Sequence, residues 1–506
     1  MKKFFFACSF VLLGLHLSTA QSISLQITDA NTAESIPFAN IKVNNTTHLI
    51  SNAEGYCTLS EKFNADATQV TVSYLGYVPA EVTLAELKAN EYKVKLVPAI
   101  VELETLTIKN ERPNADSIMA AVKQNLKVHY KGNGLAFKDQ LFKRSSSGFV
   151  PKKVDITIDK STGFSKEQLK TTNADLRIFG DKLIKQPPFG FKDLLCNYYT
   201  TLTTKNDKPL FVSKLEAVKA ASLRNSEQAV SLEDMNEMVE KTFLKHLDPN
   251  KFYRLKSGLF GSRDTISLKE GMHEKNGKSK PETTVSKART DMMTTLYRNN
   301  FMQSEKFDFL NQLDYYTYTY EGKTYKSDED YVYIIRFTPD KSKAKYTGKL
   351  YISATDYAIV RCDYTLAEGK TLNSFNMKFL LGIKSSENVN KGTIIYKKNP
   401  VGTGYYLQYA SMETGQYIYV NRPLKFIELT DAEKDVVSFN LKVEGTAVNK
   451  TELLNLNREE TSNATVEQFK ENDLTYTPLK RYDPSFWKEY SVIEPLEAMK
   501  QLKSEE

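Results

Sequence analysis

The stretch Val70-Thr-Val-Ser-Tyr-Leu-Gly-Tyr77 decides the fold class of the first part of the chain. Apolar residues at positions 70, 72 and 74 alternate with Thr71 and Ser73. Strict alternation over this length predicts a β-strand with one buried face. Gly76, which stands between two tyrosines, marks a bend or bulge where a side chain would clash.

The same alternation recurs on both sides of this strand. It is carried by three further sets of apolar positions: Ile23, Leu25 and Ile27; Val78, Ala80, Val82 and Leu84; and Tyr92, Val94 and Leu96. At Val101–Ile108 the phase slips, which a bulge or a change of sheet would explain. About seven short strands in so few residues favour a β-sandwich over residues 21–108.

Four motifs occur in order within this region: Ser35-Ile-Pro-Phe-Ala-Asn40, Asn52-Ala-Glu-Gly-Tyr56, the quoted strand, and Glu102-Leu-Glu-Thr-Leu-Thr-Ile108. Their order closely resembles the carboxypeptidase regulatory-like domain of Bacteroidetes, a transthyretin-like sandwich. Gly55 suits the tight hairpin turn of the second motif. Thr105 and Thr107 stand where the family often has Val, a departure that leaves the fold intact. The resemblance implies an interaction or folding module.

In that family the domain precedes the plug of outer-membrane TonB-dependent transporters, or it heads envelope proteins of unknown function. We expect the second group, because this chain of 506 residues shows no plug sequence and is short for a large barrel. Resemblance to this group extends loosely to Phe337–Ile352 and to the segment Tyr482–Trp487. It implies a curved antiparallel sheet such as lipoprotein carriers use.

The N-terminus has the pattern of a cleaved signal peptide. Lys2 and Lys3 form a positive region, Phe4–Leu17 is an apolar core, and Ser18-Thr-Ala20 offers the small side chains that a signal peptidase needs. The alternative is a membrane anchor, for which ~20 apolar residues are needed. We expect residues 1–20 to be removed and no transmembrane helix in the rest. The protein would be exported to the periplasm or outer membrane, with the cell surface as a further option.

Behind the sandwich the sequence predicts a helical linker at residues 109–130, capped by Asn114 or Asp116. A β-rich α+β domain is expected over residues 131–445, with a helix at Ser231–Leu247 and a polar loop at Gly271–Asp291. Residues 446–506 carry few strand signals, and we expect Asp483–Tyr490 to pack an aromatic anchor onto the body. The fold class is therefore mainly β with some α: a seven-stranded transthyretin-like sandwich, then a larger α+β region built on curved antiparallel sheet.

The net charge bears on which partners the chain can bind, and the cysteine content bears on whether it forms disulfides. The net charge is +7, and removing Lys2 and Lys3 leaves +7 − 2 = +5. No run of five basic residues occurs, which argues against a nucleic-acid partner. An odd number of distant cysteines, Cys57, Cys196 and Cys362, indicates buried free thiols, although one bridge between two of them stays open.

The search for catalytic motifs finds none. A zinc carboxypeptidase needs His-x-x-Glu and a distant histidine, and no such motif follows His48, His129, His246 or His273. No Gly-x-Ser-x-Gly elbow and no Walker or dinucleotide glycine pattern is present. Spacing alone leaves a Ser-His-Asp triad open. The sequence therefore offers no catalytic, cofactor-binding or metal-ligand residue and points to no cofactor.

Three weaker patterns were weighed against plainer explanations. Asp328-Glu-Asp330 and the pair Glu102 and Glu104 could attract calcium, but charged turns explain them as well. Dense tyrosines could form a face for sugar or lipid, or pack within strands; they lie at positions 315, 316, 318, 320, 325, 331 and 333. Asp116-Ser-Ile118 and Asp264-Thr-Ile266 look like Bacteroidetes O-glycosylation sites, a short and unspecific pattern.

The function expected from the sequence is a non-enzymatic envelope protein that binds or assembles. Its partner would be an envelope protein, a glycan or a lipid, with outer-membrane association as one option, and the curved sheet would hold that partner or an apolar ligand. The alternatives are an exported hydrolase whose catalytic site follows no motif, and a surface adhesin. A clustered Ser, His and acid in a pocket would favour the hydrolase.

Overall fold

The structure is a computed structural model that describes residues 23–99, 113–225, 252–257, 260–267, 284–303, 305–327, 330–378, 382–428 and 436–504. The chain divides into two compact units. The first comprises residues 1–98 and Asp483–Leu496, and the second comprises Ala99–Tyr482 and Glu497–Glu506. Four sequence predictions lie outside the described residues: the signal peptide, the phase slip at Val101–Ile108, the helix at Ser231–Leu247, and the acidic groups Glu102, Glu104, Asp328 and Glu329.

The first unit contains two small sheets. A three-stranded sheet has the order β4-β1-β7 and a four-stranded sheet has the order β3-β2-β5-β6. The strands are β1 Ile23–Asp29, β2 Asn40–Val43, β3 Thr47–Ile50, β4 Tyr56–Leu59, β5 Gln69–Ser73, β6 Ala80–Thr83 and β7 Lys93–Leu96. Alternate residues of β1, β2 and β5 are fully buried, so the alternation seen in the sequence does form one apolar face on each.

Two local features of this unit show how far the alternation can be trusted. Gly55 has φ +82°, and a Cβ there would lie 2.9 Å from the carbonyl oxygen of Ile27, so the turn requires glycine. Leu84, expected to continue a strand, instead begins helix α2 Leu84–Ala89. Thr83 and Glu86 form a capping box that starts this helix, and local capping overrides the period-two pattern.

A C-terminal segment completes the first unit. The 3₁₀ helix η3 Pro484–Trp487 and the residues after it pack with the N-terminal sheets. The Glu61 amide donates to the Lys488 carbonyl at 2.8 Å, and the side-chain amide of Asn52 donates to the Pro495 carbonyl. The aromatic segment expected to anchor on the larger body therefore belongs to the first unit instead.

The second unit is built on one sheet whose fourteen described strands run β13-β14-β15-β16-β18-β19-β20-β8-β9-β10-β21, with β17 beside β18, and β11 joining β12 to β19. Its strands are β8 Phe137–Ser161, β9 Phe189–Lys205, β10 Lys208–Arg224, β11 Phe252–Ser257, β12 Phe260–Ser267, β13 Tyr316–Ser327, β14 Asp330–Pro339, β15 Tyr346–Ser353, β16 Ile359–Leu366, β17 Leu372–Met377, β18 Ile383–Lys398, β19 Tyr405–Glu428, β20 Val436–Glu460 and β21 Thr477–Leu479.

The described helices of this unit are α3 Ala115–Tyr130, α4 Lys166–Lys185, α7 Thr284–Arg298, α8 Asp308–Asn311, α10 Asn463–Gln468 and α11 Glu497–Lys500. Asn114 caps α3 by accepting from the Ser117 amide, as one of the two predicted caps. The polar loop expected at Gly271–Asp291 is wrong for residues 284–291, which form the first half of α7. Strand β20 crosses residue 445, where the sequence placed a domain end.

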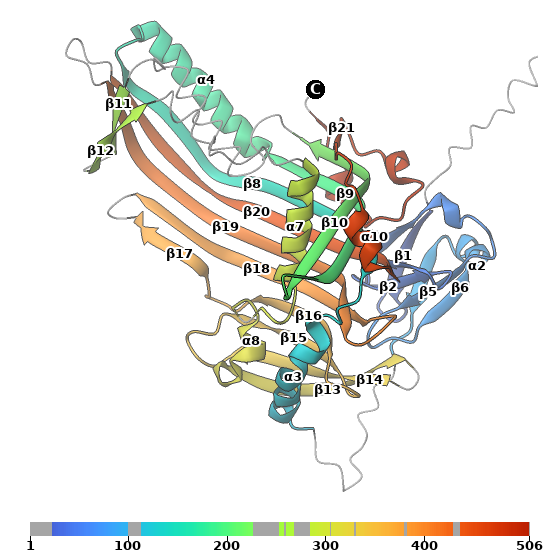
Figure 1. Cartoon of the computed structure of the whole chain (residues 1–506). Coiled ribbons are helices and arrows are strands. Elements are labelled where there is room, and N and C mark those ends of the chain that lie inside the picture. Colours follow the sequence, from blue (N-terminus) through green and yellow to red (C-terminus); the bar gives the residue numbers. More distant parts are fainter. Residues whose placement is uncertain are drawn as a thin grey trace, which may run out of the picture. The chain divides into compact units, whose positions relative to one another are not determined.

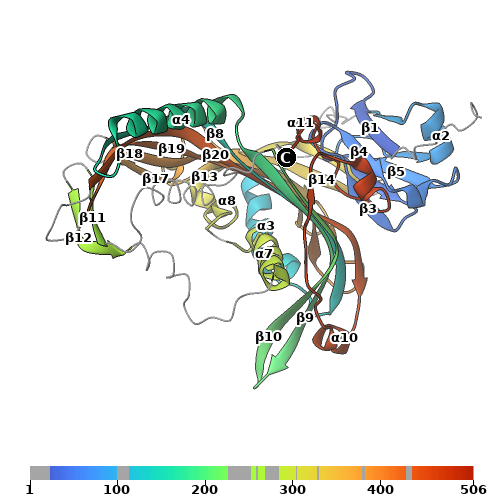
Figure 2. The same cartoon turned by 90° about the horizontal axis from the view of Figure 1, so that it is seen from above.

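The sheet is strongly curved, and α3, α7 and α8 lie on the inner side of the curve (Figures 1 and 2). Bulges along the β8–β20 pairing bend these strands of 25 residues each. Gly445 sits at one bulge, and a Cβ there would clash with the ring of Phe149 on the neighbouring strand. The predicted curved antiparallel sheet of a mainly β protein is confirmed.

Aromatic side chains fill the inner face beneath α3 and α8. Phe309 stacks on Phe337 with centroids 4.2 Å apart, and the ring of Tyr130 meets that of Tyr396 at 4.9 Å. Tyr316 and Tyr318, two of the dense tyrosines, are buried in this layer, whereas Tyr320, Tyr331 and Tyr333 cluster with one another by ring contacts. This part of the curve is therefore packed core.

Candidate functional site

Among the residues weighed in the sequence, one histidine and three cysteines lie within the described ranges as buried groups. His129 is buried, its Nε2 lies 2.8 Å from the carbonyl oxygen of Asp356, and its ring meets that of Tyr405 edge-on. Cys57, Cys196 and Cys362 are free and buried, and burial raises the pKa of each thiol. Within the described residues no group of three His, Cys, Asp or Glu side chains is placed to hold a metal ion.

The geometry points instead to the neighbouring strands β8 and β9. Lys143 and Arg144 are consecutive in β8, so their side chains leave opposite faces of the sheet. Both are buried, and each reaches a carboxylate from a different part of the chain: Lys143 bonds Asp291 of α7, and Arg144 bonds Asp193 of β9. One ion pair thus joins β8 to the helix α7 on one face of the sheet, and the other joins β8 to β9 on the opposite face.

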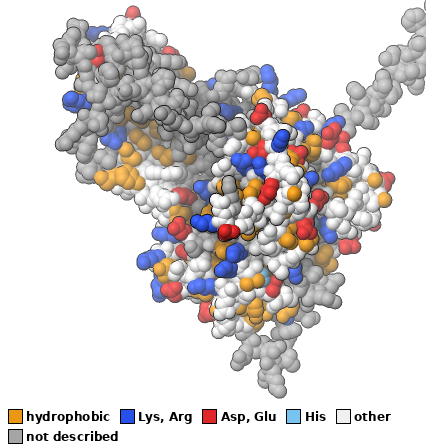
Figure 3. Space-filling view, viewed as in Figure 1, with side chains coloured by type: hydrophobic (Ala, Val, Ile, Leu, Met, Phe, Trp, Pro, Cys, Tyr) orange, Lys and Arg blue, Asp and Glu red, His pale blue; other side chains and the backbone are white. Residues whose placement is uncertain are grey.

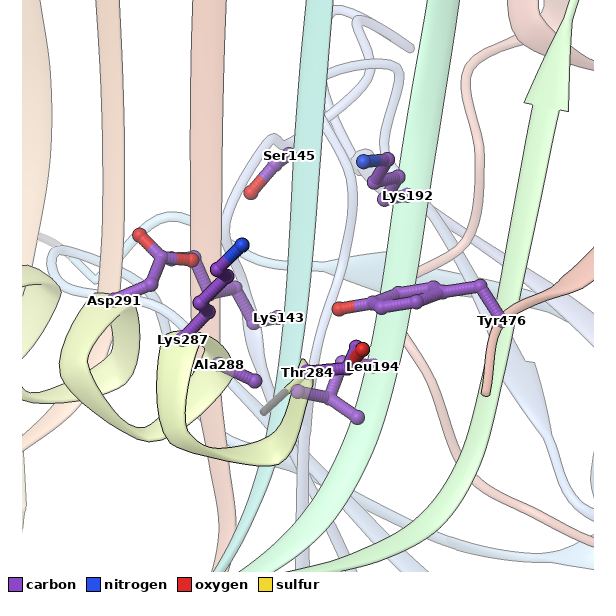
Figure 4. Close-up of a pocket in the computed structure, with 9 residues that line it drawn as sticks. All are labelled: Lys143, Ser145, Lys192, Leu194, Thr284, Lys287, Ala288, Asp291 and Tyr476. Carbon is purple, nitrogen blue, oxygen red and sulfur yellow. The ribbon is translucent and has the colours of Figure 1, made fainter. Parts of the chain in front are cut away.

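A cavity of about 260 Å³ opens on the Lys143 face (Figure 4). Lys143 and Ser145 alternate on β8, and the antiparallel register sets them opposite Leu194 and Lys192 of β9. The helix side is lined by Thr284, Lys287, Ala288 and Asp291, whose spacing of three and four residues places them on one face of α7. Tyr476, before β21, closes the remaining side with its hydroxyl directed toward the cavity.

One ion pair fixes α7 to the floor of this cavity. The Lys143 ammonium donates to Asp291 Oδ2 at 2.5 Å and to Thr295 Oγ1 at 2.8 Å, and its side chain is only 6% exposed. Burial lowers the pKa of Lys143, while the charge of Asp291 opposes that shift. Lys143 and Asp291 therefore neutralise each other within the fold.

The other charged groups of the lining are cationic. Lys192 and Lys287 are exposed and have no ion-pair partner within the part of the chain that the structure describes. The ammonium of Lys192 lies 5.7 Å from the ring centroid of Tyr476. Burial, followed by the charge of Asp291, raises the pKa of Tyr476 to about 12, so its hydroxyl stays a hydrogen-bond donor at neutral pH. Two ammonium groups, a phenol and the Ser145 hydroxyl thus surround the cavity.

This lining has the chemistry of an anion site. No histidine is among its residues, and no hydrogen bond joins Ser145 to Lys143 in the described structure. A nucleophile without a base in reach remains weak. Ammonium and hydroxyl donors are groups that bind carboxylate or phosphate oxygens.

Sequence reasoning missed every residue of this cavity. Its cationic and acidic members come from separate segments, and the first half of α7, residues 284–291, falls in the predicted polar loop. One signal was present: Val285, Ala288, Met292 and Thr295 recur at helical spacing, and three of them are buried. The pairings across β8 and β9 carry no signal of that kind.

A nucleic-acid interface would show an extended surface field of positive charge. On the face shown in Figure 3, acidic and basic side chains are interspersed, so no extended field of one sign is seen there. Of the helices in the described ranges, none combines the length and apolar character required to traverse a bilayer.

Comparison with known proteins adds no family. No protein-family model and no curated sequence matches the chain. One similar solved structure is a DUF1329 family protein from Desulfovibrio piger, with 9% identity, 70% of this chain and 97% of that chain covered, and a TM-score of 0.17. Another is a putative membrane-associated protein of unknown function from Bacteroides fragilis, with 10% identity, 86% and 97% coverage, and a TM-score of 0.11. TM-scores so far below 0.5 carry no argument about function.

Proposed function

We propose that this chain is a non-enzymatic, exported cell-envelope protein that binds the anionic group of a small ligand in the cavity between α7, β8 and β9. The observation that carries the proposal is the charge of the lining. Three lysines face one aspartate, and that aspartate is already paired with the buried Lys143. The cavity therefore presents a net positive charge through Lys192 and Lys287.

Its size limits what can enter. At about 260 Å³ the cavity is smaller than the ~300–1,000 Å³ typical of pockets that enclose drug-sized molecules. A phosphate or carboxylate with a short polar body suits it, such as the headgroup of a larger molecule. The lysine and hydroxyl donors of the lining favour an anionic group over the wholly apolar ligand considered from the sequence.

The site is also held rigidly, as recognition requires. Its strand residues sit on β8 and β9, which pair continuously from Phe137–Thr200 to Gly148–Phe189. Its helix residues are fixed by the Lys143–Asp291–Thr295 contacts. A pre-organised site loses less conformational entropy when ligand binds.

The first unit would then supply an interaction module, as the resemblance to the carboxypeptidase regulatory-like domain implies. Export rests on the leader at residues 1–20, and absence of catalysis rests on the unactivated Ser145. The interaction module and export are thus inferred from the sequence, and the absence of catalysis is inferred from the residues that line the cavity.

The experiment is a calorimetric titration with glycerol 3-phosphate, with glycerol as the neutral control. Replacing Lys192 and Lys287 by Glu reverses two charges of the lining, and we expect affinity to fall by at least about tenfold because two charge-assisted contacts are lost. The matched control is Lys166→Glu with Lys170→Glu on α4, two exposed lysines outside the cavity.

Three results decide the matter. Loss of binding in the cavity variant alone supports the proposal. Equal binding of glycerol, or equal loss in the α4 variant, contradicts it. Turnover of an ester substrate that disappears on Ser145→Ala would replace the proposal with the hydrolase alternative.

A further inference from the structure

The β9–β10 hairpin extends past the rest of the sheet (Figure 2). β8 pairs with β9 only as far as Thr200, whereas β9 and β10 continue to pair out to Lys205 and Lys208. Asn206 and Asp207 close the turn with φ of 51° and 59°, values that such two-residue hairpin turns require. Residues 201–211 therefore form a two-stranded tip, which we call the hairpin tip.

The hairpin tip carries large apolar side chains in solvent. Leu202 is 46% exposed, Leu210 is 43% exposed and Phe211 is 51% exposed. A two-stranded ribbon has no core of its own in which to bury them. Three such side chains gathered at one protruding end differ from the singly scattered apolar residues of an ordinary surface.

The register distributes these side chains over both faces of the ribbon. Leu202 lies opposite Phe211 and shares its face, whereas Leu210 lies opposite Thr203 on the other face. A protein partner with a flat surface would cover one face of the ribbon and leave the apolar side chains of the other face exposed to solvent. A medium that surrounds the tip buries all three side chains at once.

The charged residues near the hairpin tip indicate what kind of medium would surround it. Lys208 is exposed at the turn and Lys214 follows on β10, against the single acidic side chain of Asp207 in residues 201–214. Lysines next to exposed Leu and Phe form the combination that binds lipid interfaces, because apolar groups enter the acyl boundary while ammonium groups meet lipid phosphates.

We propose that the hairpin tip docks this protein on a membrane surface that carries anionic lipid, by inserting Leu202, Leu210 and Phe211 below the headgroups. The tip is separate from the anion cavity, whose residues lie elsewhere on β8, β9 and α7. Membrane docking and ligand binding can therefore fail independently.

The test is co-sedimentation of the protein, purified from the cells that export it, with vesicles of phosphatidylcholine containing phosphatidylglycerol. Leu210→Ser with Phe211→Ser should weaken vesicle binding by about 30-fold, since two half-exposed apolar groups no longer leave water. Ile178→Ser with Ile184→Ser is the matched control, because these α4 residues are 67% and 40% exposed but lie away from the tip.

A second measurement stands even if the serine variant folds poorly. Phe211→Trp places a fluorescent reporter at the tip. The chain has one other tryptophan, Trp487, which is buried. We expect a blue-shifted emission with anionic vesicles, quenched by brominated lipid. The proposal is overturned if the protein ignores anionic vesicles, if the tip and α4 variants bind alike, if pure phosphatidylcholine binds as well, or if the reporter does not shift.

Discussion

The buried pair of Arg144 and Asp193 offers the sharpest test of how this sheet is held together. Nε of Arg144 donates to Oδ1 of Asp193 at 2.8 Å and a second guanidinium nitrogen donates to Oδ2 at 2.7 Å. Both side chains are 1% exposed, and the guanidinium lies 5.4 Å from the ring centroids of Phe142 and Phe191. The pair is bidentate and isolated from solvent.

Replacing Asp193 by Asn removes the negative charge but keeps the shape. The Arg144 guanidinium then loses the carboxylate that it bonds and keeps only the charge of Glu452 on the neighbouring strand β20, which makes no ion pair with it. Losing one partner of a buried ion pair costs about 3–5 kcal/mol of unfolding free energy. The double variant Arg144→Met with Asp193→Leu removes both charges and fills the space with apolar atoms, so most of that loss should be recovered.

The assay is urea unfolding combined with hydrogen exchange of peptides from β8 and β9, which reports this sheet separately from the first unit. We expect faster exchange in Asp193→Asn and near-normal exchange in the double variant. A loss below about 1 kcal/mol for the single variant, or a double variant no more stable than the single one, would refute the reasoning.

Two further predictions concern other buried groups. Burial lowers the pKa of Lys306 to about 8, so between pH 8 and the ordinary value of 10.5 the unfolded chain binds the extra proton and stability should rise with pH. The contribution of Lys306 amounts to about 3 kcal/mol over this window. Lys306→Met should remove that contribution from the pH dependence of urea unfolding at pH 7 to 10, whereas the contribution of Lys143, whose pKa burial also lowers, remains. An unchanged pH profile would contradict the assignment. Trp487→Ala should lower the unfolding free energy of the first unit by about 3 kcal/mol, because a buried indole is lost. Calorimetry in which the transition of that unit does not move would show that the C-terminal segment contributes little.

The sequence pattern correctly predicted strands that have one buried face and one solvent-exposed face. The alternation of Ile23, Leu25 and Ile27 is reproduced as buried positions of β1. The helix α3 and its cap at Asn114 were found for a similar reason, since capping and helical periodicity are local signals.

Strand β8, in which consecutive residues are buried on opposite faces, escaped this reasoning. In β8 the side chains of Lys143 and Arg144 look like a solvated pair, yet both are buried. Their partners lie 148 and 49 residues away in the chain, so no local pattern announces them. The cavity escaped for the same reason, because tertiary pairing decides which charges meet.

The extent of the first unit was likewise hidden from the sequence, because tertiary contacts define it. Trp487 was expected to serve as an anchor, but composition alone could not choose its partner. Glu61 and Asn52 of the first unit bond to the backbone carbonyls of Lys488 and Pro495, and backbone acceptors carry no sequence signature.

Native mass spectrometry of the protein purified from its native cells tests the anion site most directly. The account predicts one small anionic molecule retained per chain, and its loss when Lys192 and Lys287 are both replaced by Glu. A chain of bare polypeptide mass that also ignores added glycerol 3-phosphate, or a ligand that survives the double replacement, would contradict it.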